Sequence, residues 1–261
     1  MLNFLVNSDR IMVRFLRYVG QVSLLFCHTL YWTFTSSFHS KRFFNQAKIV
    51  GVESFFIAVF VGFFIGVIMA LQMAYQMMQL SAEIYIPNVV AVSITRELAP
   101  VLTALIVAGR IGAGMTAEIG SMKVTEQVDA LTAFAVNPVK FLVVPRFLAL
   151  TLMLPVLTIF ADLFGILGGF IICVFKLGIT APMFVNMVTE ALVVKDIMTG
   201  LIKSVFFGMT IAMVGCHQGL SVRGGAEGVG RATTISVVTS FIMIIIMDCL
   251  FTVMFFFVFH A

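Results

Sequence analysis

Five long runs of apolar residues alternate with short polar connections along this chain. A transmembrane helix needs about 20 mostly apolar residues to cross roughly 30 Å of hydrocarbon, and each run is long enough to do so. We therefore predict an all-α integral membrane protein with about five spans in a single domain, residues 1–261. The predicted spans are approximately Ile49–Leu80, Pro87–Gly109, Phe141–Phe175, Ile197–Gly219 and Thr234–Phe259.

Residues 1–48 have a different pattern, which predicts a helix lying in the membrane interface. Arg10, Arg14 and Arg17 repeat at helical spacing while apolar residues take the other side, as expected on an anionic membrane face. The shorter apolar run Val22–Phe34 ends in aromatic residues and is predicted to be interfacial or re-entrant. The segment then acts either as a topology anchor or as an elbow that braces the first span.

Composition and charge fix the class and suggest an orientation. With 61% hydrophobic and 11% charged residues, the chain has the composition of a membrane protein. Most of the basic residues fall on one side if the N-terminus is cytoplasmic, which places the C-terminus outside after five spans. The basic residues assigned to the cytoplasm are Arg10, Arg14, Arg17, Lys41, Arg42, Lys48, Arg110, Lys123, Lys140, Arg146, Arg223 and Arg231.

The first span carries two stripes at helical spacing. One consists of small residues every fourth position, which lets helix backbones approach closely in lipid. The other is rich in methionine, whose flexible side chain suits a surface that accepts acyl chains, although an ordinary lipid-facing or core stripe has the same pattern. The small stripe is Gly62, Gly66, Ala70 and Ala74, and the methionine stripe is Met69, Met73, Gln76, Met77 and Leu80.

Several charged residues lie within the predicted spans, where ionisable groups are costly unless they face protein or water, and four of them carry the argument. Arg96 and Glu97 enter the second span, with Arg96 about 14 Å below its outer end. Arg96 is suited to contact a lipid phosphate, or it is satisfied internally by Glu97, Asp248 or backbone carbonyls. Lys203 and Asp248 lie at similar depths, about 24 and 21 Å from the cytoplasmic ends of their spans, which predicts a pair or a shared polar network.

A polar, amphipathic segment, Ser121–Ala135, follows the second span on the predicted cytoplasmic side. We predict one helix outside the bilayer, capped by Ser121 and ended by Asn137-Pro138. Its apolar ridge suits contact with a soluble partner, and packing only on its own chain is the alternative. The ridge is Val124, Val128, Leu131 and Ala135, and Glu126, Gln127 and Asp129 are further contact candidates.

The sequence has no pattern typical of an enzyme or a cofactor site. The four cysteines are isolated in apolar sequence, and the four histidines have no metal-binding spacing. The glycine-rich segment Gly224–Gly230 lacks both the GK[ST] ending and the preceding strand of a phosphate-binding loop. We expect no catalytic residue, metal or cofactor in this chain.

Four motifs resemble those of the MlaE/YrbE-type permease family. They are RELAPVLTALIVAGRIGAGMTAEIGSMKVTEQVDAL from Arg96, NPVKFLVVPRFLALTLMLP from Asn137, GILGG at Gly165–Gly169, and GCHQGLSVRGGAEGVGRATTISVV from Gly215. The resemblance runs in order from roughly Gly51 to the end. It implies an ABC-transporter permease that moves phospholipid or a related lipid between membranes.

The resemblance also implies partners and a location. It implies a homodimer in the bacterial inner membrane, two cytoplasmic ATPase subunits that bind the ATP, an outer MCE-domain substrate-binding protein and no nucleic acid. In this scheme the methionine stripe, Arg96 and Glu97 bind lipid in a cavity at the homodimer interface. Glu126, Gln127 and Asp129 couple to the ATPase, with Val128 and Leu131 as apolar anchors.

A secondary transporter or channel for an ion or small solute is the alternative, because such proteins also carry charges inside their spans. Secondary transporters commonly show paired broken helices and an inverted repeat, and we find neither in this sequence. Copurification of a separate ATPase and of lipid would distinguish the two classes.

Overall fold

The computed structural model describes the backbone of residues 2–35 and 40–260, and every regular element in this part of the chain is a helix. Side-chain surroundings are described for residue 13 and for residues 16–35 and 40–257. The all-α fold class is therefore confirmed.

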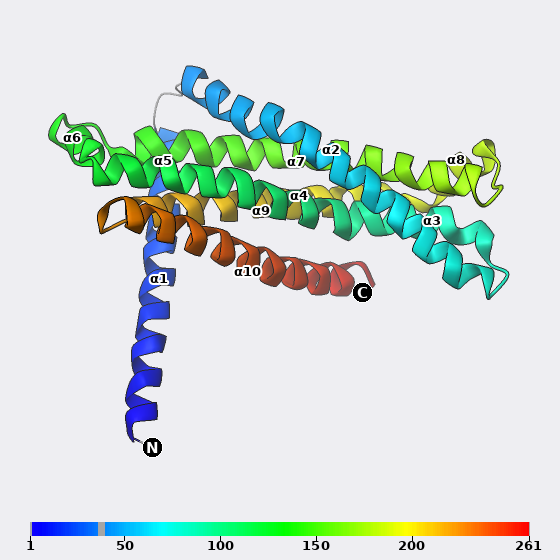
Figure 1. Cartoon of the computed structure of the whole chain (residues 1–261), viewed down its shortest axis with the longest axis horizontal. Coiled ribbons are helices and arrows are strands. Elements are labelled where there is room, and N and C mark those ends of the chain that lie inside the picture. The colour runs from blue at the N-terminus through cyan, green and yellow to red at the C-terminus, as the bar shows by residue number, and fades with distance from the viewer. Residues whose placement is uncertain (1, 36–39, 261) are drawn as a thin grey trace.

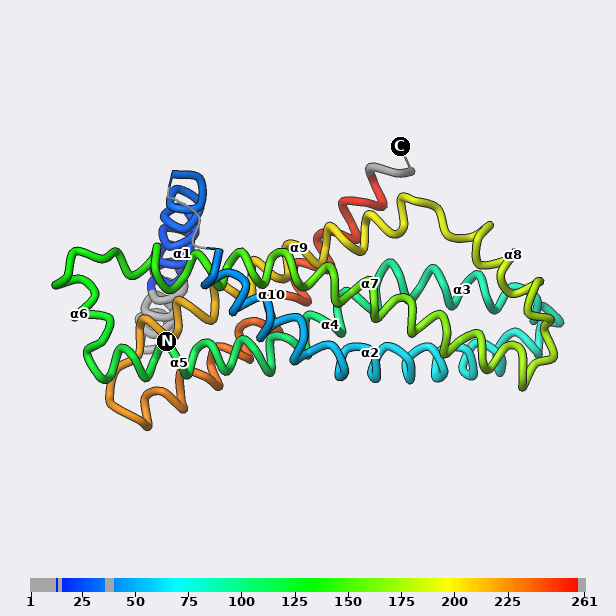
Figure 2. Tube along the Cα trace, turned by 90° about the horizontal axis from the view of Figure 1, so that it is seen from above, coloured from blue at the N-terminus to red at the C-terminus, as the bar shows by residue number. Residues whose placement is uncertain are grey.

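Five helical segments are long and apolar enough to cross a membrane, which confirms the predicted number of spans. They lie lengthwise beside one another (Figures 1 and 2). Each begins before the apolar run that predicted it, because the helix continues into flanking polar residues. The segments are α2 (Ser40–Met78), Glu83–Val124, Val139–Phe175, α9 (Val194–Leu220) and Gly225–Phe257 of α10 (Gly225–His260).

The second and third segments are each built from several consecutive helical elements. The second contains η1 (Glu83–Tyr85), α3 (Ile86–Ser93), η2 (Ile94–Leu98), α4 (Ala99–Val107), η3 (Ala108–Gly112) and α5 (Ala113–Val124). The third contains η4 (Val139–Val143) and α7 (Val144–Phe175).

Wide π turns form η2, η3 and η4, and each contains one basic residue: Arg96, Arg110 and Lys140, respectively. Pro100 follows η2 and Pro145 follows η4. Proline has no N–H to donate to the carbonyl four residues before it, which favours a wider turn at that point.

The small-residue stripe of α2 packs against the backbone of α7. Gly62 and Gly66 are buried, and a Cβ atom at Gly66 would overlap the carbonyl oxygen of Gly165. A Cβ atom at Gly62 would lie 2.7 Å from the carbonyl oxygen of Ala161. The predicted packing face is confirmed, and its partner is the glycine-rich part of α7.

The N-terminal helix α1 (Leu2–Thr35) runs across the end of the bundle near α6 (Gln127–Ala133), as Figure 1 shows. The run Val22–Phe34 is the last part of this helix and not a separate re-entrant segment. Its interfacial position stays a prediction, and the side chains of Arg10 and Arg14 lie outside the described residues. The residues that pack on the core of the spans are Val22, Leu25, Phe26 and Leu30.

A short helix, α8 (Ala181–Ala191), lies between α7 and α9 and was not predicted from the sequence. Phe184 and Val188 on this helix are buried with residues of α3. The ring of Phe184 also lies 5.2 Å from that of Phe170 on α7, measured between centroids. The apolar side of α8 therefore packs against α3 and α7.

Candidate functional site

Inside the spans, one buried lysine contacts two carboxylates. Lys203 on α9 is 1% exposed, and its Nζ atom lies 2.5 Å from Oε2 of Glu97 and 2.9 Å from Oδ1 of Asp248. The same ammonium donates a 2.8 Å hydrogen bond to Oγ1 of Thr252. The ammonium thus donates hydrogen bonds to Glu97 and Thr252 and forms an ion pair with Asp248, so its buried charge is compensated. The structure places Lys203 and Asp248 together, and it adds Glu97 from η2.

Arg96 lies beside this cluster and pairs with Asp196 at the start of α9. Its Nε atom donates a 2.6 Å hydrogen bond to Oδ1 of Asp196, and one terminal nitrogen also contacts that oxygen. Oδ2 of Asp196 accepts a 3.3 Å hydrogen bond from the backbone N–H of Val193, so the carboxylate also caps α9. The internal partners predicted for Arg96, which were Glu97, Asp248 or carbonyls, are therefore wrong.

The two sides of the Arg96–Asp196 pair differ in exposure. The side chain of Asp196 is 4% exposed, whereas that of Arg96 is 53% exposed. In the described part of the chain, the second terminal nitrogen of Arg96 has no hydrogen-bond partner. Arg96 therefore keeps N–H donors free to bind an anion while Asp196 holds the guanidinium in place.

These side chains border a hollow of about 250 Å³, which we call the Arg96 hollow. It combines charged groups with aromatic rings from the last part of α10, so both a polar headgroup and apolar atoms find contacts there. Its lining residues are Arg96, Glu97, Asp196, Thr199, Lys203, Thr252, Phe255 and Phe256.

The methionine stripe lies apart from the Arg96 hollow, because none of its residues lines it. Met69, Met73 and Met77 are half-buried and pack against the core beneath α3 and α8. Gln76 and Leu80 are exposed. Within one chain, the stripe is therefore partly a packing surface.

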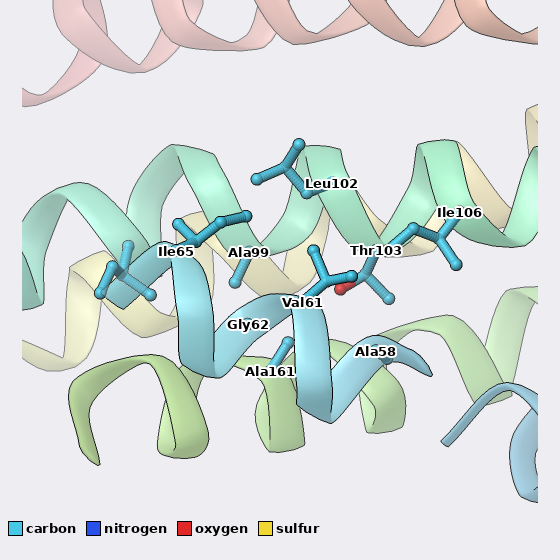
Figure 3. Close-up of a pocket in the computed structure, with 10 residues that line it drawn as sticks. Ala58, Val61, Gly62, Ile65, Ala99, Leu102, Thr103, Ile106 and Ala161 are labelled. Atoms are coloured by element: carbon cyan, nitrogen blue, oxygen red, sulfur yellow. The ribbon is translucent and has the colours of Figure 1, made fainter. Parts of the chain in front are cut away.

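A much smaller hollow between α2, α4 and α7 has a volume of about 10 Å³. Figure 3 shows Val61 of α2 near Thr103 of α4 and Ile65 of α2 near Ala99 of α4, with Ala161 of α7 below. This space is at most that of one water molecule, so it cannot hold a lipid chain.

The segment Ser121–Ala135 is not the single helix that we predicted. α5 ends at Val124, Glu126 has a left-handed backbone with φ of 59°, and α6 then begins at Gln127. Ser121 lies within α5, where its carbonyl accepts a 3.0 Å hydrogen bond from the N–H of Thr125. The side chain of Asn137 caps the following helix through the N–H of Val139. The break lets α6 fold back, and an exposed ion pair of 2.7 Å joins Lys123 to Asp129.

The candidate coupling residues have different surroundings. Glu126, Gln127 and Asp129 are exposed, and Leu131 is half-buried. Val128 is 6% exposed and packs within its own chain, so it is not free to anchor a partner. Phe134, which the sequence analysis missed, is 80% exposed just after α6.

Five apolar helical spans with an ion network among three of them define a multi-pass membrane protein. The chain matches the permease MlaE family over residues 43–254, and it belongs to that family of ABC transporter permeases. Membership of this family favours the ABC-transporter class over the secondary-transporter alternative.

Relatives from several organisms agree with this assignment. A probable ABC transporter permease protein of Rickettsia prowazekii is 44% identical over 178 residues, which are 68% of this chain and 69% of the relative. Another, of a Synechocystis species, is 42% identical over 202 residues, or 77% of each chain. A third, of Pyropia yezoensis, is 36% identical over 214 residues, which are 82% of this chain and 81% of the relative.

Proposed function

We propose that this permease moves phospholipid or a related lipid between membranes and that the lipid headgroup binds in the Arg96 hollow. The observation that carries the proposal is the half-exposed guanidinium of Arg96, held by a buried carboxylate at the edge of a hollow within the spans. Arginine suits phosphate because it offers parallel N–H donors in one plane.

The neighbouring cluster favours a fixed site. Lys203 is neutralised by Glu97 and Asp248, so it holds η2, α9 and α10 together and does not compete for the lipid. Arg96 is then the cation whose charge is accessible, and the partly exposed carboxylate of Glu97 borders the same hollow. The rings of Phe255 and Phe256 border the same hollow and suit the glycerol and acyl parts of a lipid.

The acyl chains and a second copy of the chain require apolar surface, and two helices offer it. In the most apolar window of each span, 11% of α10 and 28% of α2 is buried, compared with 56% of α9. We propose that α10 and α2 border a cavity at a homodimer interface, with the exposed end of the methionine stripe at its rim. An MCE-domain protein would receive or deliver lipid on the outer side of the inner membrane.

ATP hydrolysis is proposed to occur in a separate cytoplasmic ATPase that contacts α6. Glu126, Gln127 and Asp129 offer exposed polar contacts, and Leu131 offers a half-buried apolar one. Phe134 is the large apolar side chain with the highest exposure in this segment, and we add it to the proposed contact. Buried apolar anchors dominate the affinity of such contacts.

Photocrosslinking tests the lipid assignment. A photoreactive residue would replace Phe256, Met73 or Met77 in the permease, reconstituted with its ATPase in phospholipid vesicles. We expect phospholipid adducts at these positions whose yield changes with ATP hydrolysis, because transport empties and fills the cavity. Leu163 on α7, which is 57% exposed, is the control position for bulk lipid. Equal labelling at all positions, independent of ATP, would contradict the proposal.

Gly66 and Ala70 are unsuitable positions for the probe. Both are buried where α2 packs against its own chain, and at Gly66 any added side chain overlaps Gly165. A probe at either position would therefore contact protein and not lipid.

A further inference from the structure

A second hollow lies at the end of the bundle where α1 crosses the spans, with a volume of about 430 Å³. It is bordered by α1, the start of α2 and the segment that leads from α6 into α7. We call it the Trp32 hollow, and it shares no lining residue with the Arg96 hollow. The residues that set its chemistry are Trp32, Arg42, Asn137, Lys140, Phe141 and Pro145.

Two basic side chains in the Trp32 hollow are held by aromatic rings. Cζ of Arg42 lies 3.4 Å from the ring centroid of Phe141, and Nζ of Lys140 lies 5.4 Å from a ring of Trp32. Stacking occupies the flat face of a guanidinium and leaves the N–H donors at its edge available. Arg42 is thus oriented and still able to bind an anion through two parallel hydrogen bonds.

In the part of the chain that the structure describes, these cations have no ion-pair partner, and Glu118, which borders a neighbouring hollow together with Arg42, is paired with Arg146. Neither Arg42 nor Lys140 forms an ion pair there, and no Asp or Glu lines the Trp32 hollow. Residues 36–39 are Ser, Ser, Phe and His, so by sequence they add no carboxylate. Arg110 and Arg146, by contrast, pair with carboxylates at 3.0 and 2.7 Å. Two half-buried cations around one hollow favour an anionic ligand.

The backbone adds to the positive potential. The helical segment Val139–Phe175 begins at this hollow, where Oδ1 of Asn137 accepts a 2.9 Å hydrogen bond from the N–H of Val139. The partial positive charge of a helix N-terminus attracts anions, and here it reinforces the two side-chain cations.

The apolar lining indicates which anion fits. Trp32, Phe141 and Pro145 border the hollow, so a ligand with both a phosphate and an apolar part finds contacts for each. Next to it, α1 exposes Phe34 at 85% and Tyr31 at 60%, as expected of aromatic residues at headgroup level. We propose that the Trp32 hollow binds the phosphate of an anionic phospholipid in the membrane leaflet beside α1. This lipid is bound and not transported, and the site does not depend on the function proposed above.

Lipid titration of the purified full chain, followed by native mass spectrometry, tests the proposal. The probes are phosphatidylglycerol, which is anionic, and phosphatidylcholine, which is zwitterionic. We expect tighter binding of phosphatidylglycerol, and about tenfold weaker binding in the R42Q/K140Q variant, because two charged contacts are lost. Phosphatidylcholine has the same phosphate beside a cationic choline, so we expect it to bind more weakly to the wild type and to lose less affinity in the variant than phosphatidylglycerol does.

The matched control is K41Q/K48Q, which removes the same number of positive charges from exposed positions of α2 that do not line the hollow. We expect it to keep wild-type binding, and lipid bound near Arg96 contributes equally to both double variants. Equal loss in the two double variants would overturn the site. Should R42Q/K140Q fail to fold, R42K is the second variant, because it keeps the charge but loses the bidentate geometry. Unchanged phosphatidylglycerol binding in R42K would count against the proposed site.

Two further outcomes would assign the hollow differently. If millimolar inorganic phosphate displaces phosphatidylglycerol, the site binds soluble phosphate and the lipid proposal fails. If R42Q/K140Q keeps its lipid but loses the copurifying ATPase, the cations contact an acidic surface of the partner and the proposal also fails. Loss of lipid with an unchanged ATPase content supports it.

Discussion

Arg96 and Asp196 form an ion pair in which the acid is buried and the base is accessible. Nε of Arg96 lies 2.6 Å from Oδ1 of Asp196, and the exposed fractions of the two side chains are 53% and 4%. Removing either partner therefore has unequal consequences, since only one of the two charges can return to a polar environment on its own.

The first prediction concerns this asymmetry. R96Q should lower the free energy of unfolding by about 2 kcal/mol, because the buried carboxylate of Asp196 loses its cation. D196N should cost less, because Arg96 is already half-exposed. Thermal unfolding of the purified variants in detergent measures both effects. R96Q/D196N should recover most of the loss, and a double variant no more stable than R96Q would contradict the asymmetry.

The second prediction concerns the cluster around Lys203. K203M leaves Glu97 and Asp248 without their shared cation and should destabilise the protein by about 3 kcal/mol. K176M, which removes an exposed lysine after α7, is the control and should change stability by less than about 0.5 kcal/mol. Unfolding midpoints and expression yields provide the comparison.

A charge swap tests the pairing within that cluster. K203D/D248K should restore part of the assembly lost in K203D, because the ion pair is rebuilt with reversed polarity. Recovery should stay incomplete, since Glu97 then faces Asp at position 203. The absence of any recovery would argue that Lys203 acts through Glu97 alone.

The third prediction concerns the contact of α2 with α7. G66A should destabilise the protein by about 2 kcal/mol, because the added methyl group meets the backbone of Gly165 and cannot be accommodated by a rotamer change. G114A is the matched control, since a Cβ atom at this helical glycine meets nothing within 4 Å. It should be neutral or slightly stabilising. Equal effects of the two substitutions would show that the backbone contact is unimportant.

The fourth prediction separates a partner contact from a folding contact around α6. F134S should release the copurifying ATPase without changing the unfolding midpoint, because Phe134 is exposed in the isolated chain. L131D should weaken the same contact. V128S should lower the unfolding midpoint instead, because Val128 is buried against its own chain. Stoichiometric ATPase with both F134S and L131D would contradict the assignment of α6.

The spans could be predicted from the sequence because lipid requires long apolar helices, and that requirement is visible in composition. The packing face of α2 could also be predicted, since Gly62 and Gly66 repeat at helical spacing and small residues at this spacing let helices pack closely in lipid. α8 was missed because a helix of 11 residues is too short to cross the membrane, and the search for long apolar runs passed over it although it is amphipathic, with Phe184 and Val188 on its buried side.

The ion network could be predicted only in part. Equal depths in neighbouring spans were enough to suggest that Lys203 and Asp248 meet. Asp196 was not considered as the partner of Arg96, because it lies at the start of α9, where an acidic residue usually serves as a helix cap. Asp196 lies three residues after Val193, which is the spacing of a helix-capping side chain. The sequence therefore indicated the cap of α9 but not the ion pair with Arg96.

The break between α5 and α6 was missed for a local reason. Glu126 adopts a left-handed backbone, which is uncommon for a residue other than glycine, asparagine or aspartate. The apolar spacing of Val124, Val128 and Leu131 fits one straight helix equally well, so periodicity alone could not reveal the turn.

The wide turn at η2 adds one residue to the second span compared with a regular α-helix. A π turn holds one residue more than an α turn, so deleting one residue between Ile94 and Leu98 would close the turn and leave the helix intact. The residues of a π turn cover about the same rotation as the residues of an α turn, which are one fewer, so the parts before and after the deletion would keep nearly the same relative direction. The side chains within the turn, Arg96 and Glu97 among them, would change direction instead. A single missing codon here would thus remove the ion contacts made by the turn while α3 and α4 on either side keep their packing.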